Sequence, residues 1–233
     1  MSENTTLIAV AHGTRSPAGR RQIQELAAAV ARRRPGLDVR LCYVDVQEPK
    51  VTDVVADVVA GVPAERYGRP GAVVVPLLLS AGYHVRVDIA EAVAGTGFPV
   101  SAPLGPDDVF LESLRRDIPA GADAIVLASA GSSDPLWVRG IREVAAELPG
   151  RVELGYTSGS GPRVADVVAR LRAEGAGNVA VAAYLLAEGL FYRTLHNAGA
   201  DSVTPPLCHD PAVADLVLRR FDSQILTTVG SGL

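Results

Sequence analysis

Short, continuous apolar runs alternate along the chain with longer segments in which apolar residues recur every three or four positions. The continuous runs are typical of strands covered on both faces in a parallel sheet, and the recurring positions form the apolar stripe of a helix. The predicted strands cover residues 7–11, 38–46, 71–79 and 98–102. The predicted helices are 17–34, a segment that starts at 49, a segment that ends at 94, and 107–116.

This alternation of strand and helix starts again in the second half of the chain. Residues 124–135 match residues 7–17 at an offset of 118, and residues 152–168 match residues 39–55 at an offset of 113. Self-similarity of this kind indicates a duplicated structural unit. Residues from 222 onward lack the periodicity and are expected to form a loose tail.

We therefore expect an α/β fold of two similar lobes, each a four-stranded parallel sheet flanked by helices. The lobes are expected to comprise residues 1–118 and 119–233. The first is interpreted as a metal-binding catalytic lobe, and the second as a degenerate repeat that binds substrate.

The duplication allows one half to be compared with the other, and three chemically active side chains differ. His12 corresponds to Ala130, Asp45 to Ser158 and His84 to Phe191. Glycines, prolines and core valines are shared, which is expected of a retained scaffold. The second half therefore resembles a copy that kept the fold and lost the chemistry.

Asp45 lies at the end of the second predicted strand, and His12 and His84 follow the first and the third. Open parallel sheets bind their ligands at the carboxyl ends of the strands, so His12, Asp45 and His84 are expected to meet there. Two imidazoles and one carboxylate with open positions form a set that binds Zn, Co, Fe or Ni. Each residue alone could instead cap a turn or a helix, but their joint placement favours the metal site.

Composition narrows the functional classes. The 233 residues carry a formal net charge of -4, which argues against a nucleic-acid footprint, and no apolar run is long enough to span a membrane. The two cysteines, Cys42 and Cys208, exclude a disulfide framework and favour a cytoplasmic protein.

The Cys-His-Asp sequence at 208–210 could be a soft metal patch but is more simply incidental. The first turn lacks the glycine pattern of a nucleotide site.

Several arginines fall near the same predicted sheet edge, and two interpretations remain open for them. They could be charges that only contact solvent, or their guanidinium groups could bind the carboxylates of an acidic ligand. They are Arg15 and Arg86 in the first half, and Arg139, Arg163 and Arg193 at the corresponding edge of the second.

Three segments together resemble the class II tetrapyrrole chelatases, specifically the sirohydrochlorin chelatases of the CbiX and SirB type. These segments are AHGTR at 11–15, CYVD at 42–45 followed by EP at 48–49, and PLLLSAG at 76–82 followed by YHVRVDI at 83–89. The resemblance covers nearly the whole chain and matches the long, two-lobed form of the family.

The resemblance implies an ATP-independent enzyme that inserts Co²⁺ or Fe²⁺ into sirohydrochlorin, for cobalamin or siroheme synthesis. It assigns His12, His84 and Asp45 to the metal and to catalysis, with no cofactor beyond the substrate metal ion. Phe191 is then expected to contact the macrocycle and the arginines its carboxylates. The rival hypothesis is a metal or tetrapyrrole carrier without turnover. The expected partners are the tetrapyrrole and the metal, with no nucleic acid or membrane, in a monomer or homodimer.

Overall fold

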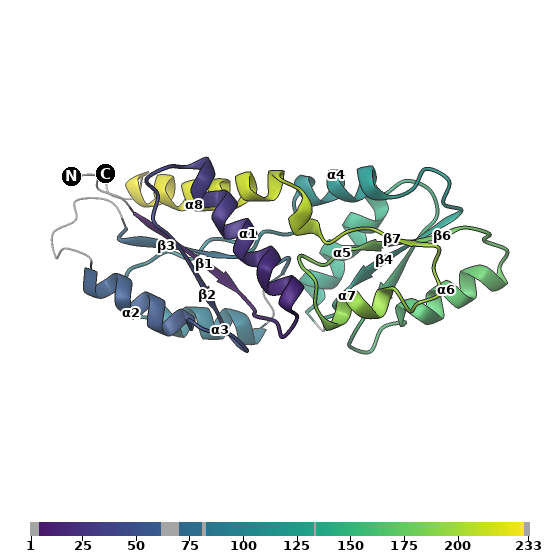
Figure 1. The fold of residues 1–233 in the computed structure, drawn as a ribbon, viewed down its shortest axis with the longest axis horizontal. Helices are drawn as coiled ribbons and strands as arrows, with labels where there is room; N and C mark the ends of the chain where they lie inside the picture. Colours follow the sequence, from purple (N-terminus) through teal and green to yellow (C-terminus); the bar gives the residue numbers. More distant parts are fainter. Residues whose placement is uncertain (1–4, 62–69, 81–82, 133, 231–233) are drawn as a thin grey trace. The chain divides into compact units, whose positions relative to one another are not determined.

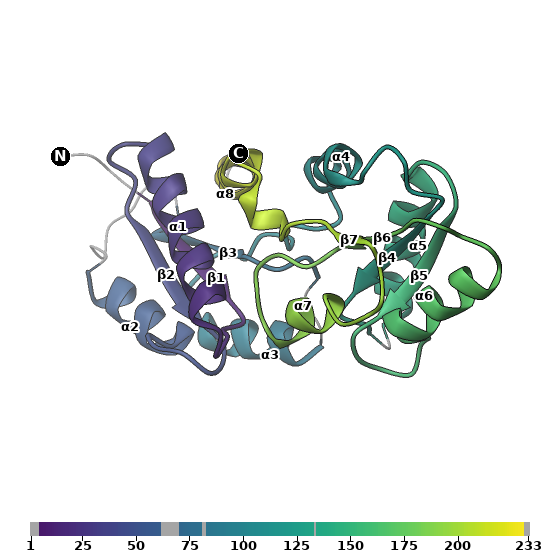
Figure 2. The same cartoon turned by 45° about the vertical axis from the view of Figure 1, so that its right-hand side comes forward.

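The computed structural model describes residues 5–61, 70–80, 83–132 and 134–230. The chain forms two compact units (Figures 1 and 2). The first unit joins Met1–Leu104 with Pro211–Leu233, and the second is Gly105–Asp210. No helix in the described part of the chain is long and apolar enough to cross a membrane.

The first unit is built on a parallel sheet whose strands lie in the order β2-β1-β3. Its strands are β1 (Thr6–Ala11), β2 (Val39–Tyr43) and β3 (Ala72–Pro76). Its helices are α1 (Pro17–Arg33), α2 (Val51–Gly61), α3 (Tyr83–Ala92) and α8 (Ala212–Gly230). Figure 2 shows α1 and α8 on one face of this sheet and α2 and α3 on the other.

The second unit repeats this architecture with the strand order β5-β4-β6-β7, again parallel. Its strands are β4 (Ala124–Ser129), β5 (Val152–Tyr156), β6 (Val179–Ala183) and β7 (Ser202–Val203). Its helices are α4 (Asp108–Asp117), α5 (Pro135–Glu147), α6 (Val164–Ala173), α7 (Leu190–Leu195) and the 3-10 turn η1 (Leu207–His209).

Local sequence signals account for where the helices that follow β1 and β4 begin. Ser16 is the N-cap of α1, where its hydroxyl accepts a hydrogen bond from the Gly19 N–H. Asp134 takes the same position before α5 and accepts from the Leu136 N–H. A proline follows each cap, where its missing N–H costs nothing. The apolar stripes of these helices pack on sheets whose central strands are fully buried.

The α/β fold with two parallel sheets flanked by helices is confirmed, with two differences in detail. In the first unit the predicted fourth strand is reduced to a parallel bridge between Val74 and Val100. In the second unit the equivalent segment is the two-residue strand β7, so only this sheet has four strands. The predicted strand 38–46 is also shorter, because the chain turns after Tyr43.

The expected tail after residue 222 is wrong, because α8 continues as far as Gly230. Arg34 donates two hydrogen bonds to the Asp222 carboxylate, at 2.6 and 2.7 Å. Phe221, one residue earlier, is only 4% exposed. The segment is therefore anchored by packing and by an ion pair.

The last helix of each repeat lies with the other repeat. Helix α4 ends the first repeat in sequence but belongs to the second unit, where Phe110 packs edge-on against Tyr184. Helix α8 ends the second repeat but packs in the first unit, where Arg220 donates to the carbonyl oxygens of Pro103 and Leu104. The compact units therefore do not divide the chain at residue 118.

Candidate functional site

The carboxyl edge of the first sheet brings two of the predicted residues together. The loop that follows β1 and the loop that follows β2 are joined by backbone hydrogen bonds. The Val44 N–H donates to the Ala11 carbonyl oxygen at 3.0 Å, and the Asp45 N–H donates to the His12 carbonyl oxygen at 3.0 Å. Both His12 and Asp45 are exposed, as residues that receive a ligand from solvent must be.

Gly13 explains why the two loops can approach so closely. It has a φ of +97°, a left-handed conformation that favours glycine. A Cβ atom at this position would overlap the Asp45 carbonyl oxygen. Glycine is therefore required next to His12 for two independent reasons.

The loop after β2 is further shaped by contacts of Asp45 and Gln47. One Asp45 carboxylate oxygen accepts a hydrogen bond from the Val46 N–H at 2.7 Å. The Gln47 side-chain oxygen accepts from the Thr14 N–H at 2.8 Å, which joins the two loops a second time. Val46 lies between them with a φ of +62° and is the one non-glycine residue with positive φ in the described part of the chain.

The third predicted residue, His84, falls in the first turn of α3, which follows β3. Its side chain lies outside the described residues. Among the side chains that the structure describes, no three His, Cys, Asp or Glu residues form a group that could hold a metal ion. The three-residue metal site therefore remains a prediction. The structure describes how the backbones of His12 and Asp45 are joined, and the His84 side chain lies outside the described residues.

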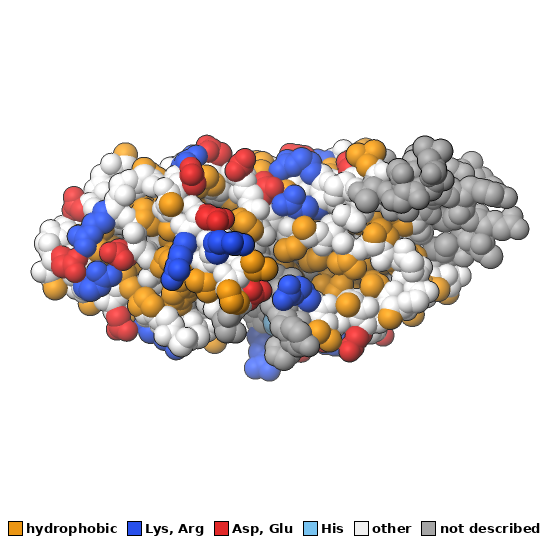
Figure 3. All heavy atoms as spheres, turned by 180° about the vertical axis from the view of Figure 1, so that it is seen from behind, with side chains coloured by type: hydrophobic (Ala, Val, Ile, Leu, Met, Phe, Trp, Pro, Cys, Tyr) orange, Lys and Arg blue, Asp and Glu red, His pale blue; other side chains and the backbone are white. Residues whose placement is uncertain are grey.

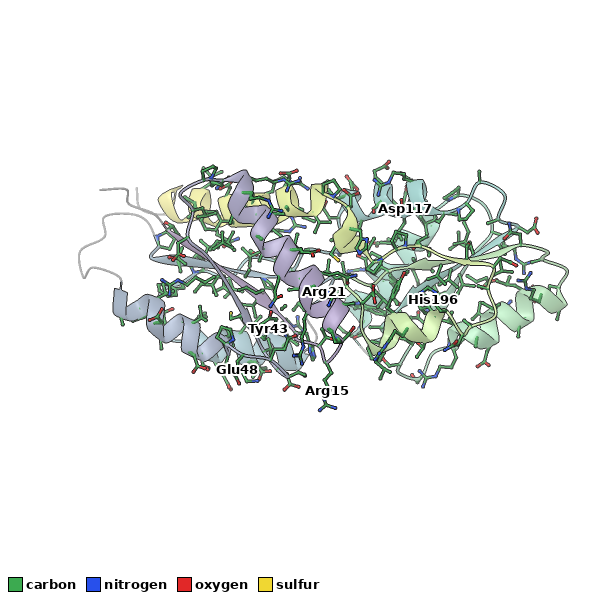
Figure 4. All side chains as sticks on the ribbon, in the orientation of Figure 1. Arg15, Arg21, Tyr43, Glu48, Asp117 and His196 are labelled. Atoms are coloured by element: carbon green, nitrogen blue, oxygen red, sulfur yellow. The ribbon has the colours of Figure 1, made fainter. Side chains whose placement is uncertain are left out.

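The arginine and aromatic candidates are divided between the two units. Arg15 extends from the loop after β1 away from the ribbon (Figure 4), and Arg86 lies on α3. In the second unit, Arg163 is the N-cap of α6, while Phe191 and Arg193 lie on α7. Phe191 is 40% exposed, and the neighbouring Leu190 on the same helix is 66% exposed.

Burial controls the chemistry of two side chains beneath this sheet edge. Burial raises the pKa of the Cys42 thiol to about 12, so Cys42 is a core residue and not a nucleophile. Burial also raises the pKa of the Tyr43 hydroxyl, and a hydrogen bond with the Gln47 side chain partly offsets that effect. Neither residue is a candidate for metal binding.

The Cys-His-Asp sequence at 208–210 lies in and directly after η1 of the second unit. Asp210 is buried, and its carboxylate accepts from Arg116 at 3.0 Å. This contact ties η1 to α4 and gives Asp210 a structural role. Elsewhere, arginines and acidic side chains are interspersed on the face shown in Figure 3, without a region of one sign.

Sequence reasoning did not single out Val46 and Gln47, although both shape the loop that carries Asp45. The available signal was in the repeat, where the residues equivalent to Val46 and Gln47 are Gly159 and Ser160. Gly159 has a φ of +80°, so both repeats require a left-handed residue at this point.

Comparison with known proteins identifies the family. The CbiX family model matches two stretches, residues 6–120 and 124–224, which together cover most of the chain. The chain belongs to the CbiX family. That the match covers both halves agrees with the internal duplication, and the two-lobed chelatase-like fold is as predicted.

Individual relatives of this CbiX-family chain agree with the assignment. A sirohydrochlorin cobaltochelatase from Methanococcoides burtonii is 29% identical over 91 residues, which are 39% of this chain and 65% of that protein. The chain thus matches slightly less than two thirds of this relative's length.

Two solved structures share the fold over nearly their whole length. SirB from Bacillus subtilis with Fe³⁺ has a TM-score of 0.77 and 18% identity, and covers 97% of this chain and 98% of its own. The sirohydrochlorin chelatase SirB from Bacillus subtilis subspecies spizizenii, in complex with cobalt, has a TM-score of 0.74 and 19% identity. It covers 97% of each chain.

Proposed function

We propose that this protein is a sirohydrochlorin chelatase that inserts Co²⁺ or Fe²⁺ into the tetrapyrrole without ATP. Family membership defines the class of reaction. The observation that carries the assignment to this chain is the pairing of His12 with Asp45 at the carboxyl edge of the first sheet. The second repeat has Ala130 and Ser158 at these positions and offers no equivalent ligands.

His12, Asp45 and His84 would hold the incoming metal ion, which is a substrate and not a resident cofactor. Three protein ligands leave coordination positions open, so the ion can be passed to the macrocycle nitrogens. A closed set of four ligands would retain it. A neutral imidazole can also accept one of the two pyrrole protons that insertion releases.

The second unit would bind the tetrapyrrole. Phe191 offers an exposed ring to the flat macrocycle, and Arg163 and Arg193 are exposed cations suited to its carboxylates. Arg15 and Arg86 would contribute the same contacts from the first unit. A cytoplasmic location, and a monomeric or homodimeric state, remain part of the proposal.

The decisive experiment is a steady-state absorbance assay with sirohydrochlorin and Co²⁺ or Fe²⁺ in the absence of ATP. A chelatase converts many equivalents of tetrapyrrole per protein molecule, whereas a metal or tetrapyrrole carrier stops at one. The Asp45→Asn variant is expected to lose turnover, and Ser158→Ala, at the equivalent position of the second repeat, is expected to keep it. Conversion limited to one equivalent in the unmodified protein would contradict the proposal.

A further inference from the structure

The two repeats share one backbone hydrogen bond between their first two loops, which identifies that bond as part of the scaffold. In the first unit the Val44 N–H donates to Ala11 at 3.0 Å, and in the second the Thr157 N–H donates to Ser129 at 2.9 Å. The glycines at 13 and 131 likewise have φ values of +97° and +88°. Contacts common to both repeats cannot account for chemistry that only one repeat has.

One difference is the residue that follows Asp45. Both repeats place a left-handed residue there, but the second uses Gly159 and the first uses Val46. A β-branched side chain is strongly disfavoured at positive φ. Val46 is also 38% exposed, so burial of its side chain does little to offset the strain. Strain of this kind persists where surrounding contacts enforce it, and it is concentrated at functional sites.

The turn at Val46 is closed by the next residue, because the Gln47 N–H donates to the Asp45 carbonyl oxygen at 2.6 Å. The turn at Val46 directs the Gln47 side chain back toward the loop that follows β1, where its oxygen accepts from the Thr14 N–H at 2.8 Å. The same side chain lowers the pKa of the Tyr43 hydroxyl, which burial raises, and Tyr43 lies in the core. Ser160, the equivalent of Gln47, is exposed and has a shorter side chain.

We propose that Gln47 is a positioning residue that fixes the loop carrying His12 against the loop carrying Asp45, so that both side chains face one metal ion. This inference rests on the proposed function, because it concerns the same metal site. The role proposed for Gln47 is exerted through the two loops and needs no contact with the metal or the tetrapyrrole. Its side chain reaches from the loop after β2 to the Thr14 N–H, two residues after His12.

The test compares Gln47→Met, which keeps the side-chain length without a hydrogen-bond acceptor, with Gln47→Glu, which keeps the acceptor. Ser160→Met is the matched control in the second repeat. Loss of a residue that orients metal ligands costs about 10- to 100-fold in metal affinity or activity. Gln47→Met should therefore weaken Co²⁺ binding, followed by visible absorption, by roughly tenfold or more. It should lower kcat by a similar factor and leave the KM for sirohydrochlorin within about twofold.

Gln47→Glu is expected to retain most of the Co²⁺ affinity, and Ser160→Met to retain all of it. Amide hydrogen exchange adds a readout that is independent of activity: Thr14 should exchange faster in Gln47→Met, while Val44 stays protected. Unchanged Co²⁺ affinity in Gln47→Met, an equal loss in Gln47→Glu, or unchanged exchange at Thr14 would each overturn the inference. If the unmodified protein binds Co²⁺ but does not insert it, the proposed function is wrong. The inference about Gln47 is then unaffected, because it is tested by the Co²⁺ affinity of the variants.

Discussion

The Asp45 N–H donates to the His12 carbonyl oxygen at 3.0 Å, so the two residues are joined through their backbones while both side chains remain exposed. The scaffold therefore sets the separation of the two side chains, and the side chains are left available to a ligand. This division makes it possible to change the chemistry of the exposed side chains without changing the fold.

Gly13→Ala tests the fold at this point. The substitution forces a left-handed alanine and overlap with the Asp45 carbonyl oxygen, and should lower the free energy of unfolding by about 2 to 3 kcal/mol. Gly131→Ala is the matched variant, because its Cβ would overlap the Ser158 carbonyl oxygen. Chemical denaturation should show similar losses for both, but only Gly13→Ala should weaken Co²⁺ binding. Equal effects on Co²⁺ binding would contradict a metal site in the first unit.

His12→Ala and His84→Ala test the chemistry. Each should lower kcat for metal insertion by roughly 10²-fold or more, because a ligand and proton acceptor is lost. His12 is exposed, so its removal should change the free energy of unfolding by less than about 0.5 kcal/mol. Initial rates at saturating metal, with the melting temperature as the control, check this. Near-normal turnover in either variant would remove that histidine from the site.

Phe191→Ala and Arg193→Ala should raise the KM for sirohydrochlorin far more than they lower kcat. A desolvated, charge-assisted contact contributes about 1.5 to 3 kcal/mol, which corresponds to a roughly tenfold or larger change in KM. Leu226→Ala, which removes an exposed apolar side chain from α8, and Arg142→Ala on α5 are the controls. If kcat falls instead and KM stays constant, the two residues take part in catalysis and not in substrate binding.

The two cysteines should differ sharply in reactivity toward an alkylating reagent. Burial raises the pKa of Cys42 to about 12, so almost none of it is thiolate at pH 8, whereas Cys208 is half-buried. Mass spectrometry should show fast labelling of Cys208 and labelling of Cys42 only after unfolding. In Cys208→Ser, fast labelling should disappear, and fast labelling that persists would mean that Cys42 is accessible.

The exchange of α4 and α8 predicts which fragments fold. Residues 1–104 joined by a Gly-Ser linker to 211–233 should fold cooperatively, whereas residues 1–118 should not. The shorter fragment lacks Val213, Leu216 and Val217, which are fully buried. Burial of each such side chain contributes about 1.5 to 3 kcal/mol, and typical domains are stable by only about 5 to 15 kcal/mol. Thermal melts of both fragments check this, and a cooperative melt of 1–118 would refute it.

Much of the fold could be predicted because it depends on local patterns. The run at 7–11 and its copy at 124–129 are the central strands of the two sheets, and the caps at Ser16 and Asp134 start the following helices. The placement of α8 could not be predicted. An apolar stripe shows that a helix buries one face, but it does not show which of two similar sheets receives that face.

The same limit applies to the site. Residues near the ends of strands at one sheet edge are predictable, which is why the sequence predicts that His12 and Asp45 meet there, as their backbones do. The role of Gln47 depends on how far a side chain reaches across two loops, and the conformation of Val46 opposes its intrinsic preference. Neither property can be found in hydrophobic periodicity. The glycine at 159 was the one local sign of the turn.

The place of α8 also sets the order in which the protein can mature on the ribosome. Domains usually fold as they emerge, with the N-terminal one first. Here the unit that carries His12 is completed by residues 212–230, which are synthesised after the whole of Gly105–Asp210. The second unit has all its segments available earlier and can therefore finish first. A chain that ends at Asp210 would thus contain every segment of the second unit but lack the helix that closes the first.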